Sequence, residues 1–236
     1  MILAALALLA AAEPYKVDPS QGNSTFSAVF DAPLGERINA ISSQVGCSLT
    51  WDEAAGTAAG SCSVPLLSIT VDNEPIKAEH FQQWSTNKKS KPKACSYEAK
   101  FEGVPAKLEA HKEVPFTADV AFTVCGRPRE DGGKERLEGS ALLMPAGSYG
   151  EAQTIRIRGK VTAFNRESYR VGPKFTDGWL ARVQALAQVV SATGTVDLSL
   201  FARKVNPKEE KEEKEEKEEK ESKKGKKGGK AADAMK

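Results

Sequence analysis

Several segments of the chain alternate apolar and polar residues with a period of two, and this pattern limits the fold more than any other feature of the sequence. Between Phe116 and Val124 every second residue is apolar, and within Cys95–Glu102 the side chains of Tyr97 and Phe101 fall on one face. Such alternation is typical of strands that bury only one face. The pattern therefore predicts an antiparallel sheet with one apolar side.

Similar segments recur along the chain at the spacing of hairpins. They are Ser24–Phe30, Asn39–Trp51, Ala59–Ile69, Arg136–Met144, Thr154–Ala163 and Thr195–Phe201. In the segment 154–163 we expect Ile155, Ile157, Val161 and Ala163 to share a face. About eight strands without parallel crossovers favour a sandwich or an up-and-down barrel. Because the apolar face is bulky, we predict an all-β fold built as an eight-stranded antiparallel barrel, a size that holds either a filled core or one small ligand.

Two segments have helical rather than strand-like patterns. Pro75 stands at a first-turn position, which favours a short helix that places Ile76, Phe81 and Trp84 over one end of the barrel. Near 178–191 six apolar residues recur at helical spacing: Trp179, Leu180, Val183, Leu186, Ala187 and Val190. This spacing predicts a second helix.

The two ends of the chain do not show the strand pattern. Residues 1–12 form a short apolar stretch that ends in three alanines, which is typical of an export signal and too short to span a bilayer. A buried first strand is the alternative, and the Ala/Leu composition disfavours it. We predict a signal peptide at 1–12, a folded domain at 13–204 and a charged low-complexity tail at 205–236, in a periplasmic or secreted protein.

The charged residues of the folded part are balanced. From Lys204 to the end there are 12 Lys against 9 Glu and 1 Asp, which leaves 22 basic and 22 acidic residues in the body. Nucleic acid is therefore not expected as a partner. Residues 208–221 form a Lys-Glu-Glu repeat that makes a frayed helix at best. Residues 222–236 carry a net charge of +5, and this Lys cluster either contacts anionic lipid weakly or stays solvated and disordered.

Four cysteines occur in this apparently exported chain, where disulfides are permitted. The residues Cys47, Cys62, Cys95 and Cys125 allow three connectivities, and their spacing fits no compact zinc pattern. Cys47 and Cys62 flank a turn on adjacent strands, which favours Cys47–Cys62 and, by elimination, Cys95–Cys125. Free, buried cysteines are the alternative.

Residues suited to catalysis or metal binding are scarce. The chain has two histidines, His80 and His111, and no Gly-x-Ser-x-Gly motif, so a catalytic triad has no support. His80 stands beside Glu79 without a second histidine, so no metal site is expected. His80 either orients a polar ligand group or makes one structural hydrogen bond. We expect neither an enzyme nor a cofactor.

Five segments follow one another in an informative order: Tyr15–Pro19 with Ser24–Ser27, Val64–Ile69, Lys77–Phe81, Lys91–Phe101 and Phe164–Tyr169. Together they resemble motifs of the YceI-like family of periplasmic polyisoprenoid-binding proteins, over residues 15–203. The resemblance implies an extended lipocalin-like barrel with an apolar tunnel for an isoprenoid chain or isoprenoid quinone, and no catalysis. The chain departs from the family at Lys77-Ala78, where the family has Arg-Asp, and at Lys91-Pro92, where it has Tyr-Pro.

The resemblance turns the inward apolar residues into candidate ligand contacts. The expected tunnel lining is Phe26, Phe30, Phe81, Trp84, Tyr97, Phe101, Phe116, Val120, Phe122, Ile155, Ile157 and Leu198. The expected polar contacts at the mouth are Lys77, Glu79, His80 and Asn165. Two alternatives remain: a filled structural domain whose tail docks on an envelope surface, and a binder of another amphiphile. The sequence leaves homodimer formation open.

Overall fold

The structure is a computed structural model that describes residues 12–86, 92–148, 152–175 and 190–206. The chain divides into two compact units, Met1–Lys204 and Val205–Lys236, and the fold given below is that of the first. Apart from a few terminal positions, the segments predicted as signal peptide, second helix and tail lie outside the described residues and stay predictions. Within the described ranges no helix is long and apolar enough to cross a membrane.

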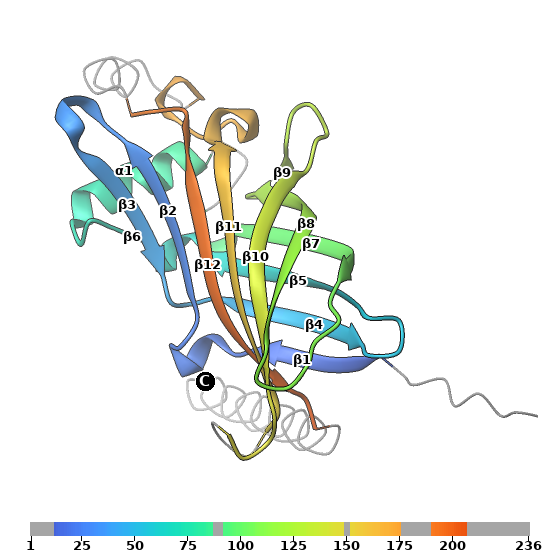
Figure 1. The fold of residues 1–236 in the computed structure, drawn as a ribbon. Helices are drawn as coiled ribbons and strands as arrows, with labels where there is room; N and C mark the ends of the chain where they lie inside the picture. Colours follow the sequence, from blue (N-terminus) through green and yellow to red (C-terminus); the bar gives the residue numbers. More distant parts are fainter. Residues whose placement is uncertain (1–11, 87–91, 149–151, 176–189, 207–236) are drawn as a thin grey trace, which may run out of the picture. The chain divides into compact units, whose positions relative to one another are not determined.

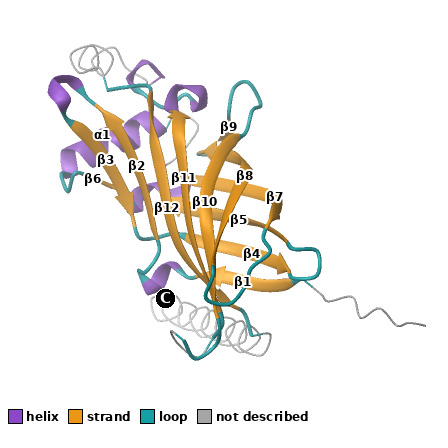
Figure 2. Cartoon of the chain, viewed as in Figure 1, coloured by secondary structure: helices purple, strands orange, loops and turns teal. Residues whose placement is uncertain are grey.

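The described part of the chain is built almost entirely from strands (Figure 1, Figure 2). They are β1 (Glu13–Val17), β2 (Thr25–Asp31), β3 (Arg37–Ser42), β4 (Gly46–Asp52), β5 (Thr57–Pro65), β6 (Thr70–Val71), β7 (Ser96–Pro105), β8 (Glu113–Val124), β9 (Arg127–Pro128), β10 (Glu135–Met144), β11 (Thr154–Asn165) and β12 (Thr193–Lys204). The α-helix α1 spans Pro75–Ser85, and short 3-10 helices include η5 (Arg166–Tyr169).

Eight of these strands close into an antiparallel barrel. In the order β1-β4-β5-β7-β8-β10-β11-β12 each strand pairs with its neighbour, and β12 pairs back with β1, where Tyr15 lies opposite Lys204. Closure satisfies the backbone groups that an open sheet edge would expose. The predicted eight-stranded barrel is confirmed.

Three further strands extend the sheet beyond the closed part. The same β12 that pairs with β1 also pairs with β2, where Leu198 lies opposite Phe26, and β2 continues to β3 and β6. Between β1 and β2 a 3-10 turn follows Asp18, whose carboxylate accepts a hydrogen bond from the Ser20 amide at 2.9 Å. β12 is therefore the strand that holds the barrel and its extension together.

The segment predicted as one strand over 39–51 is two strands. The amide of Gln44 donates to Oγ of Ser42 at 3.0 Å, so the chain turns there instead of continuing the ladder. β3 then pairs with β2 in the extension, whereas β4 pairs with β1 in the barrel. The break lets one stretch of sequence serve both parts of the sheet.

Helix α1 begins with Pro75, as expected, and lies against β6 (Figure 1). Phe81 and Trp84 pack on the hydrophobic core, and the ring of Phe81 stacks on that of Tyr97 with centroids 6.0 Å apart. Ile76 was expected to share this face but is 69% exposed. It precedes Phe81 by five residues, and the helical period of about 3.6 places the two on different faces.

Two disulfides cross-link the barrel. Cys47 and Cys62 lie opposite each other on β4 and β5 and are bonded. Cys95 just before β7 is bonded to Cys125 just after β8. These are the pairs that the sequence favours. The bonds join positions that are 15 and 30 residues apart in the sequence, and each restricts the unfolded chain.

Strand β11 contains a bulge that changes which residues face inward. Val161 lies opposite Val196, but the next register pair is Phe164 with Gly194, so β11 has one extra residue there. As a result Ala163, which the alternation placed on the inner face, is exposed, and Phe164 is buried. A bulge inserts one residue and reverses the alternation beyond it.

Gly139 on β10 lies opposite Gly159 on β11 at a point where the two strands approach closely. A Cβ at Gly139 would lie 2.0 Å from the backbone oxygen of Arg158. Since that neighbour is backbone, it has little freedom to move. Only glycine is compatible with this approach.

We predict that Gly139→Ala lowers the free energy of unfolding by about 1–3 kcal/mol, because the added methyl group overpacks the strand pair. Gly46→Ala is the matched control, since its Cβ would meet only Pro19 at 3.7 Å. Urea unfolding followed by circular dichroism measures both. Equal stabilities for the two variants would contradict the close approach of β10 and β11.

Candidate functional site

The barrel contains an apolar, partly open cavity of about 120 Å³, called here the main cavity. Each of the eight barrel strands contributes to its wall. Two polar groups of the wall are engaged within the protein: Nε1 of Trp51 donates to the carbonyl oxygen of Ala106 at 2.8 Å, and the hydroxyl of Tyr15 donates to Oε1 of Gln153 at 3.0 Å. Burial is the main reason that the pKa of Tyr15 is raised, so its hydroxyl stays neutral.

A second cavity of about 30 Å³ lies between the extension and α1. Its wall includes Phe81 and Trp84 of α1, Phe30 of β2, and Arg166. Five residues line both cavities and are called here the shared wall: Phe26, Tyr97, Phe122, Phe164 and Val196. Rearrangement of these side chains is what would join the two cavities.

The shared wall is a chain of aromatic contacts. Ring centroids are 6.0 Å apart for Phe26 and Tyr97, 6.0 Å for Tyr97 and Phe122, and 5.2 Å for Phe122 and Phe164. The hydroxyl of Tyr97 lies 2.8 Å from Oγ of Ser85, which is fully buried. Burial raises the pKa of Tyr97. This hydrogen bond anchors one side of the shared wall to the end of α1.

The volume of the main cavity indicates what it holds without rearrangement. An engineered apolar cavity of about 150 Å³ in another protein stays dry and binds benzene. At about 120 Å³ the main cavity accommodates a group of similar size, such as a ring or a short branched hydrocarbon. A longer chain requires the shared wall to open toward the second cavity.

All twelve residues predicted to line a tunnel contribute to these cavities. Phe26, Tyr97 and Phe122 line both; Phe101, Phe116, Val120, Ile155, Ile157 and Leu198 line the main cavity; Phe30, Phe81 and Trp84 line the second. The structure therefore brings the predicted set together around two adjacent apolar cavities. That these residues touch a ligand stays a prediction.

The four residues predicted at the mouth line neither cavity. Lys77 pairs with Asp72 and Glu74 at 3.1 and 2.9 Å. Glu79 and His80 are exposed on α1.

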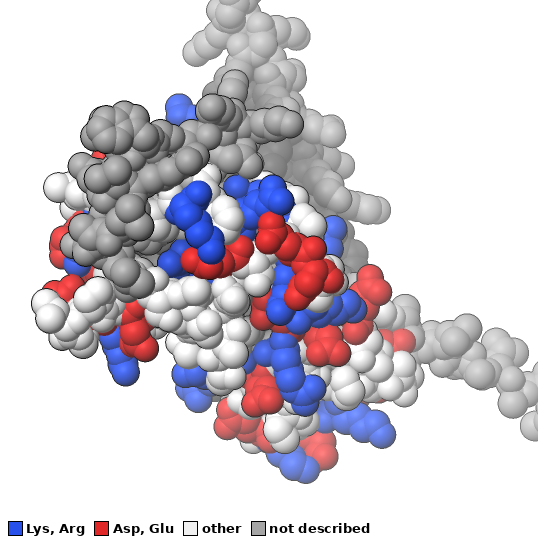
Figure 3. All heavy atoms as spheres, turned by 90° about the horizontal axis from the view of Figure 1, so that it is seen from above, with Lys and Arg blue, Asp and Glu red and all other residues white. Residues whose placement is uncertain are grey.

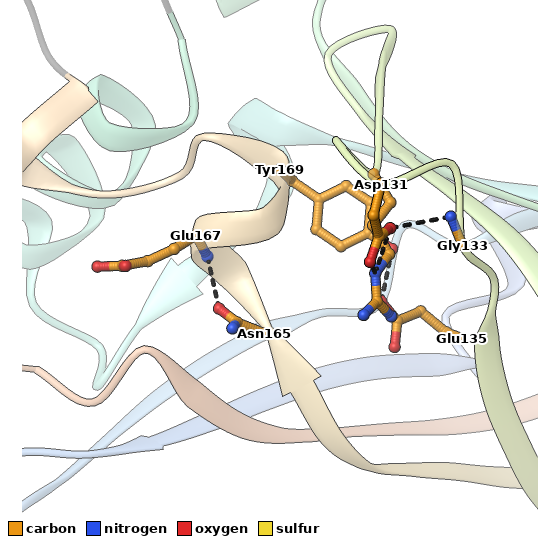
Figure 4. Close-up of polar contacts among 7 residues, drawn as sticks. Asp131, Gly133, Glu135, Asn165, Glu167 and Tyr169 are labelled. Carbon is orange, nitrogen blue, oxygen red and sulfur yellow. Dashed lines mark hydrogen bonds and ion pairs between the residues drawn. The ribbon is translucent and has the colours of Figure 1, made fainter.

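Asn165 has a local structural role, because its Oδ1 accepts a hydrogen bond from the amide of Glu167 at 3.0 Å and caps η5 (Figure 4). The role of all four residues as head-group contacts stays a prediction.

Glu135 is the one charged residue in the described wall of the main cavity. It is 5% exposed and begins β10. Its Oε1 accepts from the hydroxyl of Tyr169 at 2.6 Å and from Nη1 of Arg129 at 3.2 Å. Figure 4 shows Glu135 close to Tyr169 and to Asp131 of the β9–β10 connection.

The groups around Glu135 are fixed in place. Asp131 holds Nε of Arg129 at 2.9 Å and accepts from the amide of Gly133 at 2.9 Å (Figure 4). Burial alone would lower the pKa of Arg129, but the charges of Glu135 and Asp131 outweigh it and the pKa is raised. The pKa of Tyr169 is raised by burial and by its hydrogen bond to Glu135. Tyr169 is therefore a neutral donor to a carboxylate.

Arg166 is a buried cation held by backbone carbonyl groups. It is 6% exposed, and its three nitrogens donate to the carbonyl oxygens of Ser191, Val171 and Val190 at 3.0, 2.8 and 2.8 Å. Its guanidinium lies 5.7 Å from the ring centroid of Trp84. Burial lowers the pKa of Arg166, which nevertheless stays cationic. Arg166 thus connects η5, the segment before β12 and α1.

Sequence reasoning missed Glu135, Phe164 and Arg166. Glu135 shares the two-residue alternation of Leu137 and Ala141, so extending the predicted strand by one residue would have placed it inside. Phe164 was hidden by the bulge in β11. Arg166 stands next to Asn165 in a recognised motif, but a motif does not say which of its polar residues is buried.

Other kinds of site find no support in the described residues. No group of three or more His, Cys, Asp or Glu side chains there could hold a metal ion. In the face seen in Figure 3, basic and acidic side chains of the described part are interspersed, without a gathering of one sign. That distribution agrees with the balanced charge of the body.

The fold resembles solved structures. One is a polyisoprenoid binding domain from Saccharophagus degradans implicated in plant cell wall breakdown, with a TM-score of 0.56 and 12% sequence identity. The match covers 83% of this chain and 100% of that domain. At this identity the likeness shows the fold. No protein-family model and no curated protein matches the chain.

We predict that Arg166→Met lowers the free energy of unfolding by about 3 kcal/mol or more, because three buried carbonyl groups lose their donors. Arg158→Met on the exposed face of β11 is the control and should change stability by less than about 1 kcal/mol. Thermal unfolding monitored by near-ultraviolet circular dichroism measures both. If Arg166→Met were as stable as the control, Arg166 would not hold this end of the fold together.

Proposed function

We propose that the barrel binds an isoprenoid lipid in the main cavity without catalysing a reaction. The observation that carries this proposal is the space of about 120 Å³ inside the barrel, whose wall is apolar except for a few polar groups. Small barrels either fill their interior with side chains or hold a ligand, and this one leaves room. The likeness of the fold to a polyisoprenoid binding domain supports the same class of ligand.

The driving force for such binding needs no reactive group. Burying on the order of 300 Å² of prenyl surface contributes about 7.5 kcal/mol at about 25 cal/mol per Å². Part of this offsets the lost freedom of the ligand. Branched methyl groups of a prenyl chain suit a wall of aromatic and β-branched residues such as Phe101, Ile155 and Ile157. Apolar contact is therefore sufficient for affinity.

A binding role without chemistry fits the placement of the histidines. Both His80 and His111 are exposed, and neither lines a cavity in the described part of the chain. The buried acid Glu135 is engaged with Arg129 and Tyr169. A general base near a nucleophile, which hydrolytic chemistry requires, has no candidate in this wall.

We further propose that the protein works in the periplasm or outside the cell. Two disulfides, Cys47–Cys62 and Cys95–Cys125, support an oxidising compartment. The apolar stretch at residues 1–12 suits an export signal. Carriage of an isoprenoid lipid between membrane surfaces is consistent with such a location.

Native mass spectrometry of the full chain mixed with farnesol, a short prenyl alcohol, tests the binding function. We predict one farnesol per chain. Ala99→Trp, which places a large ring in the wall of the main cavity, should weaken binding by about tenfold or more because it fills the space. Lys100→Trp is the control, since Lys100 follows Ala99 on β7 and its side chain is exposed.

Circular dichroism of each variant checks that the barrel still forms, and Ala99→Leu gives a milder filling of the same space. Absence of any bound farnesol in the wild type, or equal loss of binding in Ala99→Trp and Lys100→Trp, would contradict binding in the main cavity.

A further inference from the structure

The main cavity contains a polar group that a purely hydrocarbon ligand does not need. Glu135 is 5% exposed and is the only charged residue that the described wall presents to this space. Burying a charge is costly unless it is paired and hydrogen-bonded. Each oxygen of the carboxylate therefore requires a hydrogen-bond donor, and the bonding shows which oxygen has none.

The two oxygens of Glu135 differ in their bonding. Oε1 accepts from both the Tyr169 hydroxyl at 2.6 Å and Nη1 of Arg129 at 3.2 Å. Among the described residues no donor reaches Oε2. Arg129, itself paired with Asp131, and the hydroxyl of Tyr169 both bind Oε1 and so hold the carboxylate in one orientation (Figure 4). One oxygen is thus fixed by the protein, and the other is available to a ligand in the cavity that Glu135 lines.

Glu135 lies next to the shared wall through its partner Tyr169. The ring of Tyr169 stacks on Phe164 at 5.2 Å and meets Phe122 edge-on at 5.5 Å. Phe122 and Phe164 belong to the shared wall between the two cavities. The carboxylate therefore lies beside this wall. The main cavity offers apolar surface to a short branched hydrocarbon, and a longer tail requires the shared wall to open toward the second cavity.

The chemistry of the free oxygen restricts the ligand. A carboxylate paired with arginine accepts hydrogen bonds and donates none. A ligand group with an O–H or N–H fits against it. An ether, an oxidised quinone carbonyl or a hydrocarbon placed against Oε2 supplies no donor to it, and a phosphate adds a like charge.

We propose that Glu135 selects isoprenoid ligands that carry a neutral hydrogen-bond donor, such as a prenyl alcohol, a prenylated phenol or a hydroquinone, and binds that donor through Oε2. This selectivity rests on the proposed function of the same cavity. It places the polar end of the ligand inside the barrel beside the shared wall, away from the exposed residues Glu79 and His80 of α1.

Equilibrium binding of farnesol and of farnesyl methyl ether to the full chain tests the selectivity. The two probes share a tail and differ in one donor. Trp51 and Trp84 line the cavities, so a change in tryptophan fluorescence reports binding, with native mass spectrometry as a second readout. Since a hydrogen bond to a charged group contributes about 1.5–3 kcal/mol, farnesol should bind about tenfold tighter or more.

Glu135→Gln keeps the shape of the side chain but adds an N–H donor that suits the ether. In this variant we predict that the preference for farnesol falls to about threefold or less. Glu138→Gln on the outer face of β10, where Glu138 is 64% exposed, is the matched control and should keep the full preference. The comparison of the two probes on the wild type does not depend on either variant.

The outcomes distinguish failure of the selectivity from failure of lipid binding itself. Equal binding of alcohol and ether by the wild type, or tighter binding of the ether, overturns the role of Glu135 and leaves lipid binding standing. An unchanged preference in a folded Glu135→Gln protein also overturns it. Failure of both probes to bind overturns the lipid-binding function and the selectivity together.

Discussion

The pairing of β12 with both β1 and β2 is the interaction on which the rest of the structure depends. At one end β12 pairs with β1, where Tyr15 lies opposite Lys204, and closes the barrel. At the other end it pairs with β2, where Leu198 lies opposite Phe26, and opens the extension. Because one strand serves both neighbours, the apolar inner faces of the barrel and the extension are continuous. The main cavity and the second cavity lie on this continuous face.

Closure also explains where the polar groups of the interior are. A closed barrel satisfies most of its own backbone, so side-chain donors are needed chiefly where the ladder ends. Arg166 supplies donors to three such carbonyl groups beyond the end of β11. Glu135, at the first residue of β10, belongs to the same end and is held by Tyr169. A structural cation and a carboxylate with one free oxygen thus lie on either side of the aromatic shared wall.

The sequence predicted the apolar residues of the cavity walls better than it predicted the contacts of the polar side chains. Period-two alternation depends only on which face is buried, so it identified residues such as Phe101, Phe116 and Ile155 without knowledge of the partners. It failed where the backbone departs from a regular strand. The bulge in β11 exchanged Ala163 for Phe164, and the turn at Gln44 divided one expected strand into two. Alternation carries no signal for either.

The polar residues show a different limit. Lys77, Glu79 and His80 were chosen by their place in a motif, yet the structure puts them at the surface of α1. The helix turns Ala78, Phe81, Trp84 and Ser85 inward instead. Glu135 could have been found by extending the β10 pattern by one residue. The difference between its two oxygens, with Oε1 bonded and Oε2 unbonded, could not be predicted in this way. It depends on the positions of Arg129 and Tyr169, which lie 6 and 34 residues away in the sequence.

The most direct test of the account is a crystal structure of the protein with a prenyl alcohol that carries bromine at the tail, recorded at the bromine absorption edge. The account predicts one anomalous peak in the interior, in the main cavity near Phe101 and Phe116 for a short tail or in the second cavity for a longer one. The alcohol oxygen should lie within hydrogen-bond distance of Glu135 Oε2. A peak found only on the outer surface, or none at a saturating concentration of the ligand, would contradict it.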